Sequence, residues 1–157
     1  MRTKLVTFIT AFLLITLCVS MTGCFGGSGI GTTHKTKWFD FIVHSIEKVD
    51  SYAGYVARPG YQLYDVLITE KNTFTDDIPM GTFDFFMQSS NDKSTYWEPL
   101  EALNSTMMPE DFTLTPGQSA QYHMVFEIPS NVTKLELIYI EFDIGGNQGN
   151  TFTIKVK

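Results

Sequence analysis

The sequence predicts an antiparallel β-sandwich of seven or eight strands, and three observations support this. Short segments with alternating apolar and polar residues recur between turn signals, and β-branched and aromatic residues dominate these segments. No long stretch of the chain repeats with the period of a helix. The 13 Phe, 7 Tyr and 2 Trp residues provide the material for a core between two sheets.

The clearest strand lies within residues 111–129, DFTLTPGQSAQYHMVFEIP. The Thr-Pro-Gly-Gln sequence at 115–118 is typical of a tight turn, since proline presets φ and glycine permits a positive φ. After it, one face carries Ala120, Tyr122, Met124, Phe126 and Ile128, and the other carries Gln121, His123 and Glu127, with Val125 as the exception. This pattern predicts a strand at 119–128 that is buried on one side.

In the first half of the domain, strands are predicted at residues 37–48, 61–72, 82–87 and 95–100. The 61–72 strand has apolar residues on both faces, so we expect it to be central. Residues 49–60 and 73–81 are predicted as loops, and the polar residues 88–94 as the connection of a hairpin.

In the second half, residues 98–108 could form a turn or two of helix, although Pro99 limits its length. Residues 112–114 are predicted as a short strand. Residues 134–142 are apolar on both faces and predict another central strand, and 143–150 form a glycine-rich loop. In the last strand, 151–157, Phe152, Ile154 and Val156 point inward.

The N-terminal 23 residues have the features of an export signal. Arg2 and Lys4 precede an apolar run of about 15 residues, which is shorter than the roughly 20 residues that span a bilayer. The cleavage region Met-Thr-Gly-Cys resembles the lipobox of bacterial lipoproteins, and the resemblance implies that Cys24 is lipidated. The alternative is an incidental cysteine in a freely secreted protein. We therefore divide the chain into a signal peptide (1–23), the lipidated cysteine with a glycine-rich flexible tether (24–36) and the sandwich domain (37–157).

Charge and cysteine usage exclude several classes of function. Removing residues 1–23 removes two of the 11 basic residues and none of the 17 acidic ones, which changes the net charge from −6 to −8. An acidic surface without a cluster of Lys or Arg argues against a nucleic-acid partner. Both cysteines lie within the first 24 residues, so the domain itself has no disulfide, thiol nucleophile or cysteine metal site.

Several motifs in order resemble one family. They are V-x-x-I-x-K-V at 43–49, GYQLYDVLITEKN at 60–72, LTPGQ at 114–118, VFEIP at 125–129 and LELIY at 135–139. Together they resemble the immunoglobulin-like (telokin-like) domains of unknown function found in bacterial lipoproteins, mainly of Gram-positive bacteria. The resemblance implies an immunoglobulin-like fold shared with a secreted mycobacterial immunoprotective antigen. That family carries no agreed catalytic residues.

No motif indicates an enzyme. The chain has no Gly-x-Ser-x-Gly nucleophile motif and no phosphate-binding glycine loop. His34, His44 and His123 have no spacing typical of a shared site, although zinc or copper is conceivable if their strands pair. Acidic residues recur in the predicted loops, at Asp50, Asp76, Asp77, Asp92, Glu110, Asp111 and Asp143. They leave calcium binding open as an alternative; we expect no cofactor and no resident metal.

Aromatic residues in loops indicate a binding surface. Tyr52 and Tyr55 lie in the 49–60 loop and Tyr61 directly follows it, and tyrosines in loops supply rigid contact area for a partner. Trp38 and Trp97 are expected to fill the core. We expect a lipid-anchored protein on the extracytoplasmic face of the cell membrane that binds an envelope or extracellular protein and is not an enzyme. An ion- or solute-binding accessory protein is the alternative, and an envelope hydrolase is a remote one.

Overall fold

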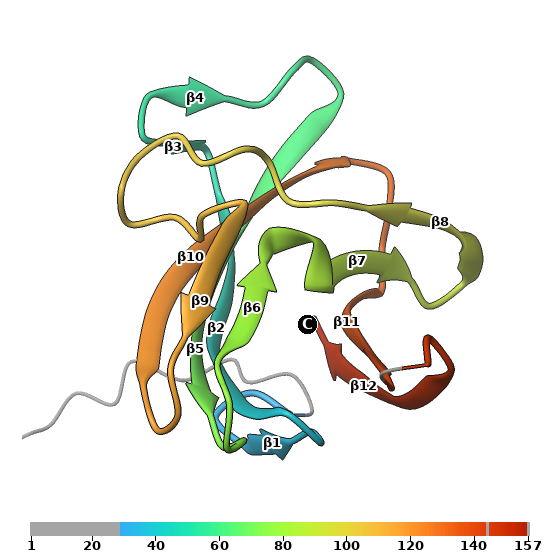
Figure 1. The fold of residues 1–157 in the computed structure, drawn as a ribbon. Coiled ribbons are helices and arrows are strands. Elements are labelled where there is room, and N and C mark those ends of the chain that lie inside the picture. Colours follow the sequence, from blue (N-terminus) through green and yellow to red (C-terminus); the bar gives the residue numbers. More distant parts are fainter. Residues whose placement is uncertain (1–28, 144, 157) are drawn as a thin grey trace, which may run out of the picture.

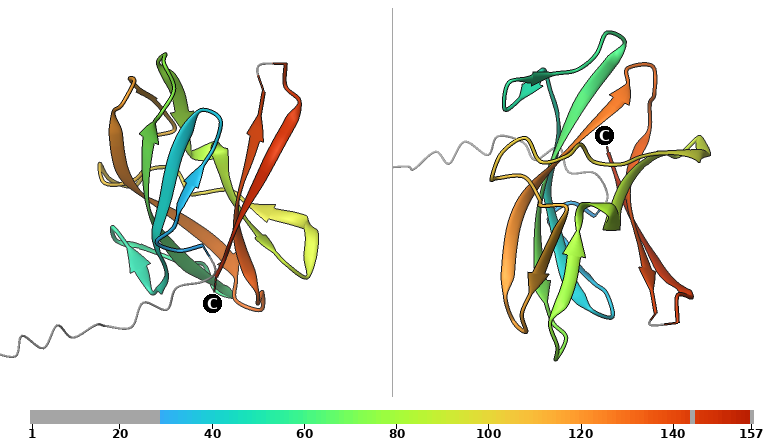
Figure 2. Two further views of the ribbon diagram at one scale, coloured as in Figure 1. Left: turned by 90° about the horizontal axis from the view of Figure 1, so that it is seen from below. Right: turned by 45° about the horizontal axis from the view of Figure 1, so that its top comes forward.

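The structure is a computed structural model that describes residues 29–143 and 145–156, without the side chain of Phe83. The predicted signal peptide and Cys24 lie outside these residues. Two four-stranded antiparallel sheets pack face to face (Figures 1 and 2). The prediction of an antiparallel β-sandwich is confirmed. In the described part of the chain there is no apolar helix of membrane-spanning length.

The first sheet has the strand order β1-β2-β5-β10. Its strands are β1 (Thr33–Lys35), β2 (Phe39–Val49), β5 (Tyr61–Asn72) and β10 (Ser119–Pro129). β5 is central, as its two apolar faces predict, and it pairs with β10 from Tyr61 to Lys71. β2 pairs along the other side of β5, with a bulge between Val43 and Ser45.

The second sheet has the order β12-β11-β7-β8. Its strands are β7 (Phe85–Ser89), β8 (Asp92–Trp97), β11 (Leu135–Phe142) and β12 (Gln148–Lys155). β11 is central, again as its two apolar faces predict. A 3-10 turn, η1 (Thr82–Asp84), precedes β7, so the strand predicted at 82–87 begins three residues later than expected.

Two short ribbons complete the sandwich. β3 (Ser51–Tyr52) pairs with β4 (Tyr55–Val56) inside the segment predicted as a loop. β6 (Ile78–Gly81) pairs with β9 (Asp111–Leu114) and adds Met80 and Leu114 to the core. β6 falls in a predicted loop because it is four residues long and its partner is distant in the sequence.

The core between the sheets is aromatic. Phe41 is fully buried, and its ring meets those of Phe85, Tyr139 and Phe152 at centroid distances of 5.3 to 5.7 Å. Edge contacts of this kind stabilise aromatic pairs beyond the area they bury. The two tryptophans predicted as core residues, Trp38 and Trp97, are both partly buried against this core.

A second, smaller cluster explains the Val125 exception in β10. Val125, Leu63 and Met107 are buried together on the outer face of the first sheet. The segment between β8 and β9 lies over them, because the backbone N–H groups of Leu100 and Met108 donate to β10 carbonyls at 2.7 and 2.9 Å. This docking holds residues 98–108 in an irregular conformation, and the short helix expected there is wrong.

The predicted boundary between the tether (24–36) and the domain is wrong as well, because the ordered structure begins before residue 37. Thr33–Lys35 form β1, which pairs with Asp40–Ile42 of β2, and the N–H of Gly31 donates to the carbonyl of Val43 at 2.8 Å. The ring of His34 stacks on Phe41 at 4.8 Å, which fixes β1 to the core. Composition alone did not reveal this, because the strand is three polar residues long and follows a glycine-rich run.

Asn72 connects β5 to the loop before β6 and to β9. Its side chain is fully buried, and Nδ2 donates to the carbonyls of Asp76 and Leu114 at 2.8 and 2.7 Å. Its Oδ1 accepts the N–H of Phe74 at 2.7 Å. A buried amide with all of these partners orients the chain that follows it.

We expect Asn72→Asp to lower the free energy of unfolding by about 3 kcal/mol or more at pH 7, since a carboxylate would replace both donors and face two carbonyl oxygens. Urea denaturation followed by tryptophan fluorescence measures this loss. The control is Asn104→Asp: Asn104 is exposed and uses only Oδ1, as an acceptor from Thr106 and Met107. The control should change stability by less than about 0.5 kcal/mol. Equal losses in both variants would contradict the role assigned to Asn72.

Candidate ligand-binding groove

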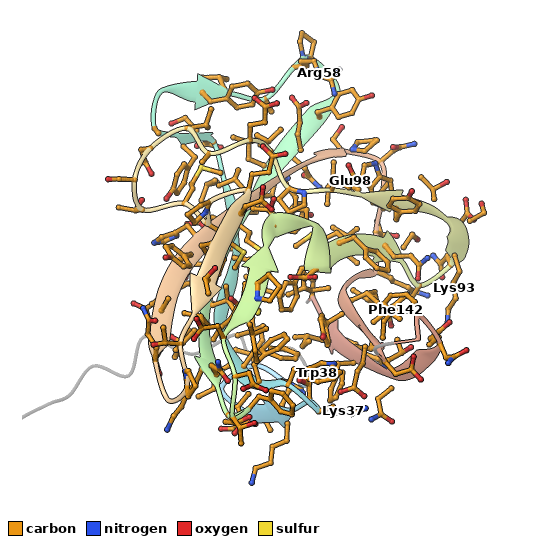
Figure 3. All side chains as sticks on the ribbon, in the orientation of Figure 1. Lys37, Trp38, Arg58, Lys93, Glu98 and Phe142 are labelled. Carbon is orange, nitrogen blue, oxygen red and sulfur yellow. The ribbon has the colours of Figure 1, made fainter. Side chains whose placement is uncertain are left out.

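An open groove of about 320 Å³ lies where the two sheets meet at one end of the sandwich. Its apolar lining comes from β2, from the 73–80 segment and from β11, and includes Trp38, Phe74, Ile78, Pro79, Tyr139 and Phe142. We call it the aromatic groove. Trp38 and Phe142 lie at the β1 end of the molecule in Figure 3, opposite Arg58. Its volume is at the low end of the range for ligand sites.

Trp38 is held at the groove by a local turn. The hydroxyl of Thr36 accepts the N–H groups of Trp38 and Phe39 at 3.1 and 3.0 Å. The indole Nε1–H donates to the carbonyl of Phe142 at 3.0 Å, which joins the residue before β2 to the end of β11. The ring of Phe74 meets that of Trp38 edge-on at 5.0 Å. The aromatic wall is therefore fixed on both sides before a ligand arrives.

Some of this apolar surface faces solvent. Phe142 is 52% exposed, whereas Trp38 and Phe74 are half-buried. Lys37 places its ammonium 4.7 Å from the centre of the Trp38 ring, so the chain itself already sets a cation against this indole.

Two acidic side chains line the groove, and a third lies behind it. Asp77 is exposed at the rim and Asp84 is half-buried in the wall. Glu70 is 0% exposed, and neither of its carboxylate oxygens has a hydrogen-bond partner within the described residues. Burial and the nearby Asp84 carboxylate raise the pKa of Glu70 to about 8. At neutral pH Glu70 is therefore mostly protonated.

Asp84 and Tyr139 form the wall in front of Glu70. Burial raises the pKa of Asp84, although the N–H of Gly81, which donates to Oδ2 at 3.1 Å, acts in the opposite direction. Burial raises the pKa of the Tyr139 hydroxyl too, and so do the charges of Asp84, Glu141 and Glu70. Phe41, the register partner of Glu70 on β2, packs its ring on Tyr139 at 5.7 Å, so Glu70 lies beside this wall.

The tyrosines predicted as a contact loop gather at the opposite end of the sandwich. Tyr52 is half-buried, and its hydroxyl lies 3.0 Å from Oγ1 of Thr106. Tyr55 is half-buried against the small cluster, and Tyr61 is 36% exposed beneath the Arg58 guanidinium, at 4.4 Å. The structure brings these rings together around the β3–β4 ribbon, but much of their surface packs within the domain. Their role in partner binding stays a prediction.

The histidines and acidic loops do not converge. Nε2 of His34 lies 3.0 Å from the carbonyl of Gly29, Nε2 of His44 lies 2.8 Å from Oγ1 of Thr69, and Nδ1 of His123 lies 2.8 Å from the Asp65 carboxylate. Among residues 29–143 and 145–156, no three His, Cys, Asp or Glu side chains are arranged to hold a metal ion.

The sequence analysis did not predict the groove, although the sequence contains one signal for it, an acidic residue on an apolar strand face. The alternation of β5 places Glu70 on the same face as Val66 and Ile68, both of which are fully buried. An acid on an apolar face indicates a special site. Phe74, Asp77 and Asp84 carry no such signal, because their position depends on how the 73–84 segment folds back over the core.

The pKa of Glu70 makes stability depend on pH. An acid whose pKa is higher in the native state than in the unfolded chain stabilises the fold below the unfolded value of 4.5, and this contribution is lost as the pH rises to about 8. The loss amounts to at most about 5 kcal/mol. We expect Glu70→Gln to remove this part of the pH dependence, so that its stability relative to wild type rises between pH 5 and pH 9.

Urea denaturation at several pH values measures this difference. The control is Glu47→Gln, which removes a carboxylate exposed on β2 and should follow the wild-type profile. Parallel profiles for Glu70→Gln and wild type would contradict the raised pKa.

Comparison with known proteins places the chain in a family. A family model described as a domain of unknown function, DUF4352, matches residues 28–150. No curated protein matches the chain by sequence.

Solved structures with a similar fold include three from two bacteria. YcdA of Bacillus subtilis, a candidate lipoprotein, is 16% identical with a TM-score of 0.62 over 80% of this chain, which spans only 38% of YcdA. YjhA of Bacillus subtilis is 17% identical with a TM-score of 0.60, and the match covers 82% of this chain and 98% of YjhA. MPT63, a secreted protein of Mycobacterium tuberculosis, is 10% identical with a TM-score of 0.58, and the match covers 78% of this chain and 92% of MPT63. These likenesses show a shared fold, and the resemblance seen in the sequence is confirmed: the chain belongs to the DUF4352 family of domains of unknown function.

Proposed function

We propose that the chain is a lipid-anchored binding module on the extracytoplasmic face of the cell membrane, and that it holds a protein partner in the aromatic groove without catalysing a reaction. The observation that carries the proposal is the groove itself. Trp38 and Phe74 form a preorganised aromatic wall, and Phe142, 52% exposed, borders it. Open apolar surface of this kind, next to a few polar groups, is typical of a contact site.

The location rests on the N-terminal sequence and on the relatives. The export-like segment 1–23 and the Gly-Cys pair at 23–24 favour lipidation after export. YcdA, a candidate lipoprotein, and MPT63, a secreted protein, share the fold. Both kinds of protein work outside the cytoplasm, which supports an envelope or extracellular location for this chain.

The anchor is tested with Cys24→Ala in the native host. We expect the wild-type protein to remain with the membrane fraction and to incorporate radiolabelled palmitate, because two or more acyl chains hold a protein firmly on a bilayer. The variant should lose the label and appear in the medium or remain as an unprocessed precursor. A membrane-bound, unlabelled wild-type protein would contradict the lipid anchor.

The contact site is tested by placing a photocrosslinking phenylalanine analogue at two exposed positions. Phe142 borders the groove, and Val56, 66% exposed, lies in the β3–β4 ribbon beside the tyrosines. We expect a defined crosslinked protein from position 142 that disappears when Phe74→Ala removes part of the aromatic wall. A crosslink from position 56 that survives Phe74→Ala would instead support the tyrosine loop and overturn the groove as the contact site.

A further inference from the structure

The charged side chains that line the aromatic groove have one sign. Asp77 and Asp84 line it, and no Lys, Arg or His is among its lining residues in the described part of the chain. The two salt bridges of the described residues lie away from the groove lining: Arg58 pairs with Glu127 at 2.7 Å, and His123 pairs with Asp65 at 2.8 Å. Lys37 lies over the Trp38 ring at 4.7 Å, but neither Asp77 nor Asp84 forms a salt bridge within the described residues, so both carboxylates of the lining are open to a cation of a ligand.

Asp84 is the carboxylate best placed to meet a ligand. It is half-buried in the groove wall, and the one hydrogen bond the described residues give it comes from the N–H of Gly81, to Oδ2. An ion pair formed at a partly dehydrated carboxylate is stronger than one at the open surface. A cationic group in the groove would therefore gain more at Asp84 than at the exposed Asp77.

Glu70 adds a second, independent observation. It is 0% exposed and lacks a donor to either oxygen within the described residues, and its register partner on β2, Phe41, packs on Tyr139 of the groove wall at 5.7 Å. A buried acid without partners costs stability, and an apolar side chain at this inward-facing position of β5 would avoid that cost. Its presence adds a second carboxyl group next to the groove wall, buried and mostly protonated at neutral pH.

We propose that the groove binds a lysine or arginine side chain of the protein partner, with the aliphatic stem against Trp38 and Phe74 and the cationic head at Asp84, in front of Glu70. Charge complementarity and size both support this occupant. A volume of about 320 Å³ accommodates a long side chain and part of its neighbour. Long basic side chains bury their stems on apolar surface while the charged head keeps its polar contacts. This inference rests on the proposed function and specifies the chemistry of the partner.

The test uses fluorescence of Trp38 in the Trp97→Phe protein, where Trp38 is the only tryptophan. The probes are blocked tripeptides with lysine, glutamine or glutamate between two leucines. We expect the lysine peptide to bind at least about 10-fold more tightly than the glutamine peptide, and the glutamate peptide to bind more weakly than both. Asp84→Asn should bring the lysine and glutamine peptides within about 2-fold of each other, whereas Glu70→Gln should leave most of the preference for lysine, because Glu70 is mostly uncharged at neutral pH.

The matched control is Asp50→Asn, which removes the same charge from an exposed position between β2 and β3. It should keep the full preference for lysine. Equal affinities for the three peptides, no binding of any of them, or a preference that survives Asp84→Asn would overturn the inference. A response of Trp38 to CaCl2 alone that Asp84→Asn abolishes would overturn it too, by assigning the site to an inorganic cation. None of these outcomes removes the crosslink from position 142, so the inference and the proposed function fail separately.

Discussion

The pairing of β5 with β2 on one side and β10 on the other is the constraint on which the rest of the sandwich depends. β10 follows β5 without a register shift from Ser119–Lys71 to Pro129–Tyr61. Because side chains alternate along a strand, this register turns Val66 and Ile68 toward the second sheet and Leu63 toward the outer cluster. A slip of one residue would exchange these faces and place Asp65 and Leu67 in the core.

The same register carries two polar residues, Glu70 and Asn72, into the interior at the end of β5, and the chain treats them differently. Asn72 finds a partner for each of its polar atoms and uses them to fold the following segment over the core. Glu70 finds none among the described residues. The segment that Asn72 orients contains Phe74 and leads to Asp84, so the aromatic wall and the acid facing Glu70 both depend on the β5 register.

The strands that the sequence predicts well are those with a long local pattern. Residues 61–72 were expected as a central strand, and β5 has the same bounds; β10 and β11 differ from expectation by one residue. β1, β3, β4 and β6 contain two to four residues and exist because a partner lies beside them, which no local alternation can reveal. The groove could not be predicted from local sequence patterns for the same reason. Trp38, Phe74 and Phe142 are far apart in the chain, and only the meeting of two sheets brings them together.

The two aromatic ends of the molecule differ in how far their polar atoms are satisfied. At the tyrosine end, the Glu127 carboxylate accepts the backbone N–H and Nε–H of Arg58 at 2.8 and 2.7 Å, and the Tyr52 hydroxyl contacts Thr106. These polar groups are therefore already bonded within the domain, and a partner would have to compete with these contacts. At the groove end the aromatic wall is fixed, while Asp84 and Glu70 have fewer partners than they can take. Binding energy is available where rigid apolar surface lies beside unsatisfied polar groups, and in this domain the groove end meets that condition better than the tyrosine end.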